Sequence, residues 1–371
     1  MSATTTPSHR LIGKTKAALD TPALIVDLDI LEANIARIAA TCRENGVGWR
    51  PHTKAHKTPE IARLQLAAGA IGIACAKLGE AEVMAAAGIR NIFIVNQIVG
   101  ADKVRRLIDL VDRAEPIVAV DCVANLGELA TAAHAARKTL DVVIEVDIGM
   151  HRAGVLPGAP VVALAGEIAR RPGLRLVGVT GWESQATRIA DPVVKERTIV
   201  EAIAELVASA RACVEAGHRM SIVSCGGTGT FPWCTQQPGV TEVQTGGAIF
   251  SDVHYRTHYH VHFPYALTVL ATVTSRPTPT RIVFDAGNKT MSEDAAVPQP
   301  LGIPAVKAMK LSAEHTTVEL EMPSQTPGVG DKIDFVVGYS DTTVHLHEEI
   351  IGVRKGRIEE VWRIAGRGKI K

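Results

Sequence analysis

The sequence contains few aromatic residues and has almost no net charge. Phe, Trp and Tyr make up 4% of its 371 residues, whereas 46% of the residues are hydrophobic. The apolar content is therefore mainly Ala, Val, Ile and Leu, which is typical of parallel sheets covered by helices. The formal net charge is +1, so the composition indicates neither a nucleic-acid partner nor an anionic membrane surface.

The sequence also lacks a disulfide framework and an obvious targeting segment. None of its six cysteines forms a CxxC pair, and a chain of this length does not need disulfides to hold its core, so we expect reduced thiols. The polar first twenty residues contain no apolar segment of the signal-peptide kind. No apolar run reaches the ~20 residues that a membrane-spanning helix needs. We therefore expect a cytoplasmic protein.

Strand-like and helix-like segments alternate from Thr21 to about Gly247. Short β-branched runs are each followed by a longer stretch with helical spacing of apolar residues. The runs are Ala23–Val26, Gly48–Pro51, Ile71–Ala74, Ile92–Val95, Ile117–Val120, Val142–Val146, Leu176–Thr180, Ser221–Val223 and Val240–Gln244. A β/α barrel has eight strands, so one of these nine runs must lie elsewhere, and we expect it to be the first.

Two helix starts carry local signals. Asp29 and Glu32 have the spacing of a capping box, which predicts a helix start at Asp29. Asp191 followed by Pro192 predicts the start of a long helix that ends near Gly217.

After about Tyr265, strand-like runs follow one another without helices between them. The runs are Ala266–Val273, Arg281–Asp285, Thr317–Glu321, Lys332–Val337, Glu349–Arg354 and Ile358–Ile364. This pattern predicts a separate all-β domain. The expected division is an N-terminal extension over residues 1–22, a barrel over residues 23–260 and a β-domain over residues 261–371.

A basic segment directly follows the second predicted strand. It contains His52, Lys54, His56 and Lys57, at the carboxyl end of a strand, where barrel enzymes place their active sites. A lysine that forms a Schiff base must lose its proton, and cationic neighbours in a partly buried site favour the neutral amine. The spacing alone is equally compatible with a solvated basic loop.

Three further segments at strand ends carry groups that can bind an anionic ligand. Arg152, in a charged segment with glycines, can pair with an anionic oxygen. The glycine-rich segments Ser224–Gly229 and Gln244–Gly247 follow late strands, where barrels bind phosphate, and their N–H groups can hold an anion. Neither matches a nucleotide-binding fingerprint, and ordinary tight turns are the alternative.

One segment of the predicted β-domain carries groups that can bind metals. Asp341, His345 and His347 lie close together in the sequence, and alternation along a strand would place the two histidines on one face. Without other support, an ordinary polar strand is the favoured interpretation of this pattern.

Taken together, the motifs resemble those of the fold-type III pyridoxal-phosphate (PLP) enzymes, in particular the D-threonine aldolase and D-serine dehydratase group. The resemblance extends from Thr21 to Lys369, and the order of the motifs carries it. It implies an α/β fold: an alanine-racemase-like, PLP-binding β/α (TIM-like) barrel followed by a C-terminal all-β domain, which the first strand, about residues 22–28, joins. It also implies a homodimer with the active site at the subunit interface.

The resemblance assigns roles to individual residues. It implies that Lys54 holds PLP as a Schiff base, that Arg152 pairs with the phenolate oxygen of PLP, and that Gln244 lies near the pyridine nitrogen. His52 is placed in the cofactor site beside Lys54. The residues implied to surround the phosphate are Ser224, Gly226, Gly227, Thr228, Gly229, Gly246 and Gly247.

The sequence departs from the group at its metal site. Aldolases and dehydratases of the group bind a divalent cation through a His-x-Asp or His-x-Cys pair, and here Tyr339 replaces the histidine while Asp341 is kept. A phenol with a pKa near 10 is a poor ligand for Mg²⁺ or Mn²⁺ at neutral pH. Three possibilities stay open: Asp341 binds Mn²⁺, Mg²⁺ or Zn²⁺, His345 or His347 substitutes, or the site works without metal.

The implied activity is that of a PLP-dependent carbon–carbon lyase, which cleaves a D-β-hydroxy-α-amino acid to glycine and an aldehyde. Lys54, His56, Tyr339 and His347 are the candidate catalytic residues, the last three as acceptors of the β-hydroxyl proton. The alternatives are a metal-independent racemase that uses Lys54 and Tyr339, a D-serine or D-hydroxyaspartate dehydratase, and a non-catalytic PLP carrier. The carriers are single barrels, so the predicted β-domain argues against the last.

Overall fold

The computed structural model describes residues 7–303 and 305–371, and the chain divides into two compact units. One unit, which we call the β-unit, contains the described residues up to Asn34 together with those of Gly247–Thr257 and Val261–Arg367. The other, the barrel unit, contains Ile35–Gly246, His258–His260 and Gly368–Lys371. This division differs from the expected boundary at residue 260, because residues 247–257 group with the β-unit.

The barrel unit is built on eight parallel strands in the order β2-β9-β8-β7-β6-β5-β4-β3. Their bounds are Gly48–Trp49 (β2), Ile73–Cys75 (β3), Ile92–Ile94 (β4), Ile117–Val120 (β5), Leu140–Glu145 (β6), Leu174–Thr180 (β7), Ile222–Cys225 (β8) and Glu242–Val243 (β9). A parallel bridge between His52 and Ala74 brings the two ends of this sheet together. The predicted β/α barrel is therefore confirmed.

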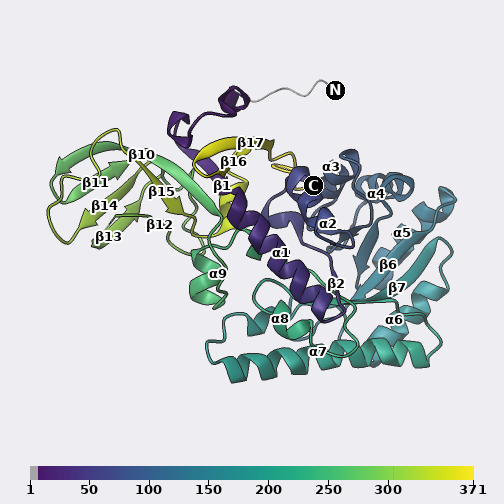
Figure 1. Cartoon of the computed structure of the whole chain (residues 1–371). Helices are drawn as coiled ribbons and strands as arrows, with labels where there is room; N and C mark the ends of the chain where they lie inside the picture. The colour runs from purple at the N-terminus through teal and green to yellow at the C-terminus, as the bar shows by residue number, and fades with distance from the viewer. Residues whose placement is uncertain (1–6, 304) are drawn as a thin grey trace. The chain divides into compact units, whose positions relative to one another are not determined.

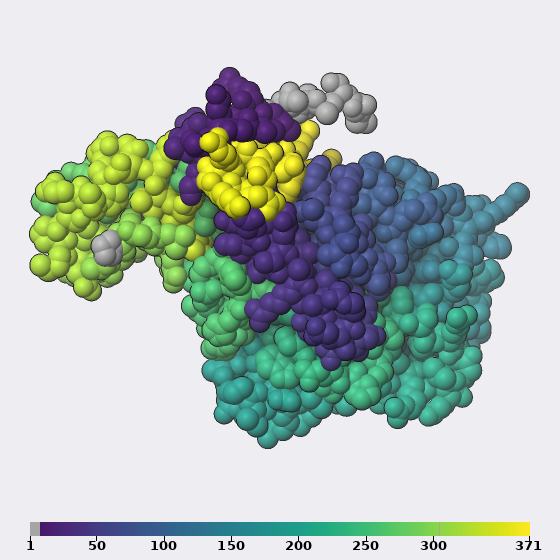
Figure 2. All heavy atoms as spheres, viewed as in Figure 1, coloured from purple at the N-terminus to yellow at the C-terminus, as the bar shows by residue number. Residues whose placement is uncertain are grey.

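Helices cover the outside of these strands (Figure 1). Their bounds are Leu28–Glu44 (α1), Pro59–Ala67 (α2), Leu78–Ala86 (α3), Ala101–Ala114 (α4), Val123–Ala135 (α5), Ala159–Ala169 (α6), Pro192–Glu215 (α7) and Phe231–Cys234 (α8), with short 3-10 turns at Thr53–Ala55 (η3) and Ser184–Ala186 (η4). In the space-filling view the segments coloured blue to teal, which contain α3 to α7, lie side by side (Figure 2). Strands such as β5 are buried along their whole length because the barrel interior covers one face and helices cover the other.

The two predicted helix starts have different outcomes. Helix α7 begins after Asp191, whose carboxylate accepts hydrogen bonds from the N–H groups of Val193 and Val194, as predicted. The prediction that Asp29 starts a helix with a capping box is wrong. Helix α1 begins at Leu28, and the Asp27 carboxylate accepts a hydrogen bond from the Ile30 N–H at 3.0 Å. The carboxylates of Asp29 and Glu32 bind the Arg354 guanidinium instead.

The β-unit contains the remaining strands. They are Ala23–Asp27 (β1), Leu267–Thr278 (β10), Arg281–Phe284 (β11), Gln299–Pro300 (β12), Val306–Leu311 (β13), Thr316–Leu320 (β14), Lys332–Val336 (β15), Glu349–Arg354 (β16) and Arg357–Arg363 (β17). Strand β1 lies between β10, to which it is antiparallel, and β16, to which it is parallel. The all-β part of the expected fold is therefore confirmed, although β12 and β13 had no clear signal in the sequence.

The β-unit also holds short helical elements, namely Pro7–Leu11 (η1), Lys16–Ala18 (η2), Gly247–Ile249 (η5), Val253–His258 (α9, except His258) and Ser340–Val344 (α10). Helix α10 corrects the expectation of a strand across Asp341, His345 and His347. The N–H and hydroxyl of Ser340 both donate to the buried Asp252 carboxylate at 2.8 Å, and this anchor turns the chain into a helix. The two histidines consequently do not share a strand face.

None of the helices in the described ranges combines the length and the apolar character needed to cross a membrane.

Candidate active site

Lys54 lies in η3, directly after β2 at the carboxyl edge of the parallel sheet. Its segment is held by hydrogen bonds on both sides. The Lys54 N–H donates to Nδ1 of His52 at 3.3 Å, and the Thr53 hydroxyl contacts the Ala74 carbonyl at 3.1 Å and the Glu80 carboxylate at 2.5 Å. Glu80 also binds the Lys57 ammonium at 3.0 Å. The second lysine of the basic segment is thus used in a buried ion pair.

The side chains around Lys54 come from distant parts of the chain. Its Nζ lies 5.8 Å from the centre of the Trp182 ring, and the Arg152 guanidinium carbon lies 5.5 Å from the same ring. The structure therefore gathers two predicted site residues around one indole. Desolvation, followed by the charge of Lys54, holds the pKa of His52 well below its ordinary value, so His52 is neutral beside the lysine.

His56, the neighbouring candidate, is fully buried. Its Nδ1 accepts a hydrogen bond from the Thr58 N–H at 3.1 Å. This nitrogen therefore holds the local loop. A catalytic role for His56 remains a prediction.

Gln244 belongs to a polar network with Ser224 and Thr180. Its Nε2 donates to the Ser224 hydroxyl at 2.9 Å and to the Thr180 hydroxyl at 3.2 Å. Because the Thr180 hydroxyl donates its own proton to the Ser224 carbonyl at 3.1 Å, it can only accept from Gln244. The amide nitrogen must therefore face this network, which leaves the amide oxygen as the acceptor. Ser224 lies with Gln244 rather than in the glycine turn.

The glycine turns after β8 and β9 need glycine for steric reasons. A Cβ on Gly246 would lie 2.2 Å from the His52 carbonyl oxygen, and one on Gly227 would lie 2.9 Å from Nε1 of Trp182. Gly226 has a φ of +75°, which L-residues rarely adopt. Gly247 opens η5 in the β-unit, where a Cβ would lie 2.3 Å from the Tyr255 hydroxyl. A side chain is thus disfavoured at each of these four glycines.

Several hydrogen-bond donors at this edge have no acceptor within the described part of the chain. The Trp182 indole N–H and the Thr245 hydroxyl are buried and unpaired. The main-chain N–H groups of Gly229 and Gly246 also lack an acceptor. Buried donors without partners are rare in proteins, and β7, β8 and β9 are adjacent. The donor set therefore fits a bound phosphate.

Trp182 was not among the residues expected at the site, and Thr245 had no role of its own within the expected segment Gln244–Gly247. A usable signal was nevertheless present, because both follow predicted strands at the same edge as Lys54. Applying the strand-end rule to every strand of the barrel would have included them.

The second group of predicted residues lies in the β-unit. The Tyr339 hydroxyl donates to Oδ2 of Asp341 at 3.0 Å. His345 is exposed, with Nδ1 3.4 Å from the Asp341 carbonyl, and Nε2 of His347 lies 2.9 Å from the Thr290 carbonyl. Burial lowers the pKa of His347. The histidine nitrogens thus contact main-chain carbonyls, and the phenol contacts the carboxylate.

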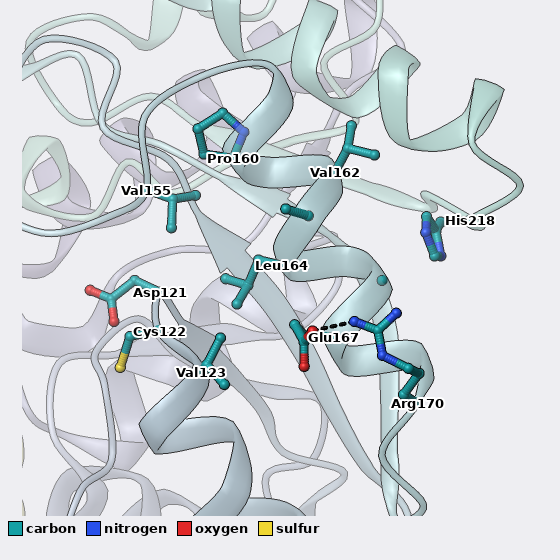
Figure 3. A pocket seen from close by; sticks show the side chains of 12 residues that line it. Asp121, Cys122, Val123, Val155, Pro160, Val162, Leu164, Glu167, Arg170 and His218 are labelled. Carbon is teal, nitrogen blue, oxygen red and sulfur yellow. Dashed lines mark hydrogen bonds and ion pairs between the residues drawn. The ribbon is translucent and has the colours of Figure 1, made fainter.

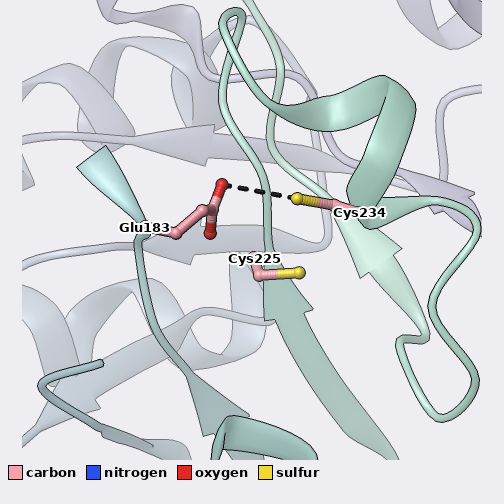
Figure 4. A group of neighbouring side chains, drawn as sticks. All are labelled: Glu183, Cys225 and Cys234. Atoms are coloured by element: carbon pink, nitrogen blue, oxygen red, sulfur yellow. Dashed lines mark hydrogen bonds between the residues drawn. The ribbon is translucent and has the colours of Figure 1, made fainter. Parts of the chain in front are cut away.

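This arrangement does not fit a divalent cation. Over residues 7–303 and 305–371, the group of three or more metal-binding side chains that the structure brings together is Glu183, Cys225 and Cys234, in the barrel unit (Figure 4). Asp341, His345 and His347 do not form such a group, and the phenol at position 339 is a poor ligand for Mg²⁺ or Mn²⁺.

A pocket of about 730 Å³ lies along α6 on the outside of the barrel (Figure 3). It is lined by Val155, Pro160, Leu164 and the ion pair of Glu167 with Arg170, among others. None of the predicted site residues lines this pocket, so the candidate active site is the strand edge around Lys54.

Known proteins resemble this chain over nearly its whole length. Residues 26–253 match the family model "Alanine racemase, N-terminal domain", and residues 266–353 match "Putative serine dehydratase domain". A D-threonine aldolase from Arthrobacter sp. is 35% identical over 96% of this chain and 95% of its own length. A 3-hydroxy-D-aspartate aldolase from Paracoccus denitrificans is 31% identical over 97% of this chain and 95% of its own length. The crystal structure of D-threonine aldolase from Filomicrobium marinum superposes with a TM-score of 0.94 at 36% identity, over 97% of this chain and 99% of that one.

Proposed function

The chain belongs to the alanine racemase N-terminal domain family of fold-type III PLP enzymes, and from this membership we propose that it is a PLP-dependent lyase. The proposed reaction converts a D-β-hydroxy-α-amino acid to glycine and an aldehyde. The observation that carries the proposal is the 35% identity to a D-threonine aldolase over 96% of the chain, together with a lysine at the carboxyl edge of the barrel.

We propose that Lys54 binds PLP covalently and that the unpaired donors of Trp182, Thr245, Gly229 and Gly246 receive its phosphate. Arg152, which lies near the same Trp182 ring as Lys54, is suited to the phenolate oxygen. The remaining residues proposed for the cofactor site are His52, Ser224, Gly226, Gly227, Thr228, Gln244 and Gly247.

Bound PLP supplies electron withdrawal at the substrate α-carbon. The protein has to accept the proton of the β-hydroxyl as the Cα–Cβ bond breaks and the aldehyde leaves, and then has to return a proton to Cα to give glycine. Of the candidate acceptors Tyr339, His56 and His347, we favour Tyr339, because its hydroxyl donates to the Asp341 carboxylate and both histidines hold main-chain groups. The phenol can pass its own proton to Asp341 as it takes the proton of the β-hydroxyl.

We further propose that the reaction in this protein does not depend on a divalent cation, since the donor set around Asp341 suits none. The proposed assembly is a homodimer with the active site at the subunit interface, as the family resemblance implies. A cytoplasmic location stays a proposal that rests on composition.

The decisive experiment incubates the PLP-loaded protein with D-threonine and D-phenylserine, with and without excess EDTA, and measures released aldehyde. We expect aldehyde in both tubes. Aldehyde that disappears with EDTA would contradict the metal-independent reaction but not the lyase. Release of neither aldehyde nor keto acid from any D-β-hydroxy amino acid would refute the lyase.

The dehydratase is the second candidate, because residues 266–353 match a serine dehydratase domain. It predicts keto acid and ammonia from D-serine or D-threo-hydroxyaspartate instead of aldehyde. The racemase alternative is tested by solvent deuterium, which it would place at Cα in both enantiomers.

A further inference from the structure

Glu183 is a buried carboxyl group that the proposed reaction does not use. It follows β7 in the barrel unit, and its side chain is fully buried. Cys225 at the end of β8 and Cys234 in α8 lie beside it (Figure 4). A buried carboxyl group is costly unless its oxygens have hydrogen-bond partners, so its contacts indicate its role.

The contacts of Glu183 are made with the glycine turn. Its Oε2 accepts from the Gly226 N–H at 3.4 Å, and its Oε1 accepts from the Thr230 hydroxyl and from the Cys234 thiol at 3.4 Å. The Thr230 hydroxyl in turn accepts from the Gly227 N–H at 3.0 Å. Glu183 therefore holds the turn at both of its ends, directly at Gly226 and through Thr230.

This anchoring divides the N–H groups of the turn into two sets. Those of Gly226 and Gly227 are directed towards Glu183 and Thr230, whereas that of Gly229 has no acceptor in the described chain. A turn whose shape is already fixed loses less conformational freedom when it binds an anion. Removing Glu183 would release Gly226 and Thr230 and, through them, the orientation of the Gly229 N–H.

The surroundings of Glu183 favour its neutral form. Its partners are a hydroxyl, a thiol and a main-chain N–H, none of them cationic, and burial is the main reason that its pKa is raised. A carboxylate at this place would also repel an anion in the turn. The isosteric amide is also neutral, but it has one acceptor oxygen and an NH₂ group that can only donate, so it keeps part of these hydrogen bonds.

Two thiols and a carboxyl group can also bind zinc. Here, however, both oxygens of Glu183 already accept hydrogen bonds from the turn, and burial raises the pKa of the Cys234 thiol well above its ordinary value. The hydrogen-bonded role therefore accounts for the contacts better than a metal site does.

We propose that Glu183 is a positioning residue that holds the turn over residues 226–230 in the shape that binds the cofactor phosphate. This inference rests on the proposed function, because it takes PLP as the ligand. It adds a residue that acts on the cofactor only through the turn.

The test compares two ligands that differ only in the phosphate group. Apoprotein is titrated with PLP and with pyridoxal, and both affinities are followed by absorbance. For Glu183→Ala we expect PLP affinity to fall by about tenfold or more, the scale of losing one or two aligned hydrogen bonds, with pyridoxal affinity unchanged. For Glu183→Gln we expect a smaller loss of PLP affinity than for Glu183→Ala, because the amide keeps one acceptor oxygen for the turn while its NH₂ group can only donate.

Further variants keep the test decisive if Glu183→Ala does not fold. Thr230→Val removes the hydroxyl that links Glu183 to Gly227, and Thr230→Ser keeps it. Only Thr230→Val should therefore lower the affinity for PLP while leaving the affinity for pyridoxal unchanged. Cys213→Ser, at a buried position in α7, is the control for general destabilisation.

Three outcomes would overturn the proposal. The first is an unchanged preference for PLP over pyridoxal in both Glu183→Ala and Thr230→Val. The second is an equal loss for the two ligands. The third is a zinc content, measured by elemental analysis after EDTA treatment, of one ion per chain in the wild type and none in Glu183→Ala. Failure of wild type to bind PLP at all would instead refute the proposed function.

Discussion

Single residues near the active site combine burial with charge. Arg50 and Glu242 form a two-pronged ion pair between β2 and β9, with both nitrogen–oxygen distances at 2.9 Å and 3% of each side chain exposed. The guanidinium also donates to Asn91. Every charge in this pair is matched, so removing one partner leaves the other buried and uncompensated.

We therefore expect Glu242→Gln to destabilise the fold by about 3–5 kcal/mol, measured as the free energy of unfolding in urea. The double variant Arg50→Met/Glu242→Leu should recover most of the loss, because no buried charge is left. A cost below about 1 kcal/mol for Glu242→Gln would show that water reaches the pair.

We expect Lys195 to make the free energy of unfolding depend on pH in the alkaline range. Its ammonium donates to the carbonyls of Thr187 and Tyr259 at 3.1 and 2.7 Å, and burial lowers its pKa to about 8. Above this pH the folded state has released a proton that the unfolded state keeps up to its own pKa of about 10.4. Unfolding then takes up a proton, so stability from this residue rises with pH between about 8 and 10.

The expected slope is at most about 1.4 kcal/mol per pH unit, and Lys195→Met should remove it. The measurement is urea unfolding of both proteins at several pH values across this window, where the difference between them isolates Lys195 from other titrating groups. Parallel curves would contradict the assignment.

At the level of secondary structure, the start of α7 can be used to test the contribution of one capping residue. Asp191 caps it by accepting from Val193 and Val194 at 2.9 and 3.0 Å. We expect Asp191→Ala to cost about 1 kcal/mol of stability and Asp191→Asn only a few tenths, since asparagine keeps the acceptor. Thermal unfolding checks both variants, and equal losses would indicate that charge matters more than the hydrogen bond.

For the protein as a whole, the cofactor is expected to contribute to stability. A ligand that binds only the folded state stabilises it by about 2.7 kcal/mol at one hundred times its dissociation constant. Excess PLP should therefore raise the unfolding midpoint of wild type, and Lys54→Ala should show a smaller rise and lose the absorbance of covalently bound PLP. An equal rise in both proteins would argue against Lys54 as the covalent residue.

Many features of the fold were predictable from local patterns. All nine runs expected in the first part of the chain are strands, and Asp191 starts α7. These predictions succeed because alternation, helical spacing and capping depend on residues within a few positions of one another. The glycine turns and Lys54 were found in the same way, since they follow directly on strands.

Other features depend on contacts between distant segments, which such patterns do not encode. Asp252 binds Ser340, where α10 replaces the expected strand, although the two residues lie 88 positions apart. The Arg354 guanidinium binds the two carboxylates of the expected capping box, although it lies 325 positions from Asp29 and 322 from Glu32. Glu183 reaches Gly226 across 43 positions. A hydrogen bond depends on where a donor and an acceptor lie in space, so folding alone determines which distant polar groups meet, whereas the order of apolar residues along the chain is enough to specify strands and helices.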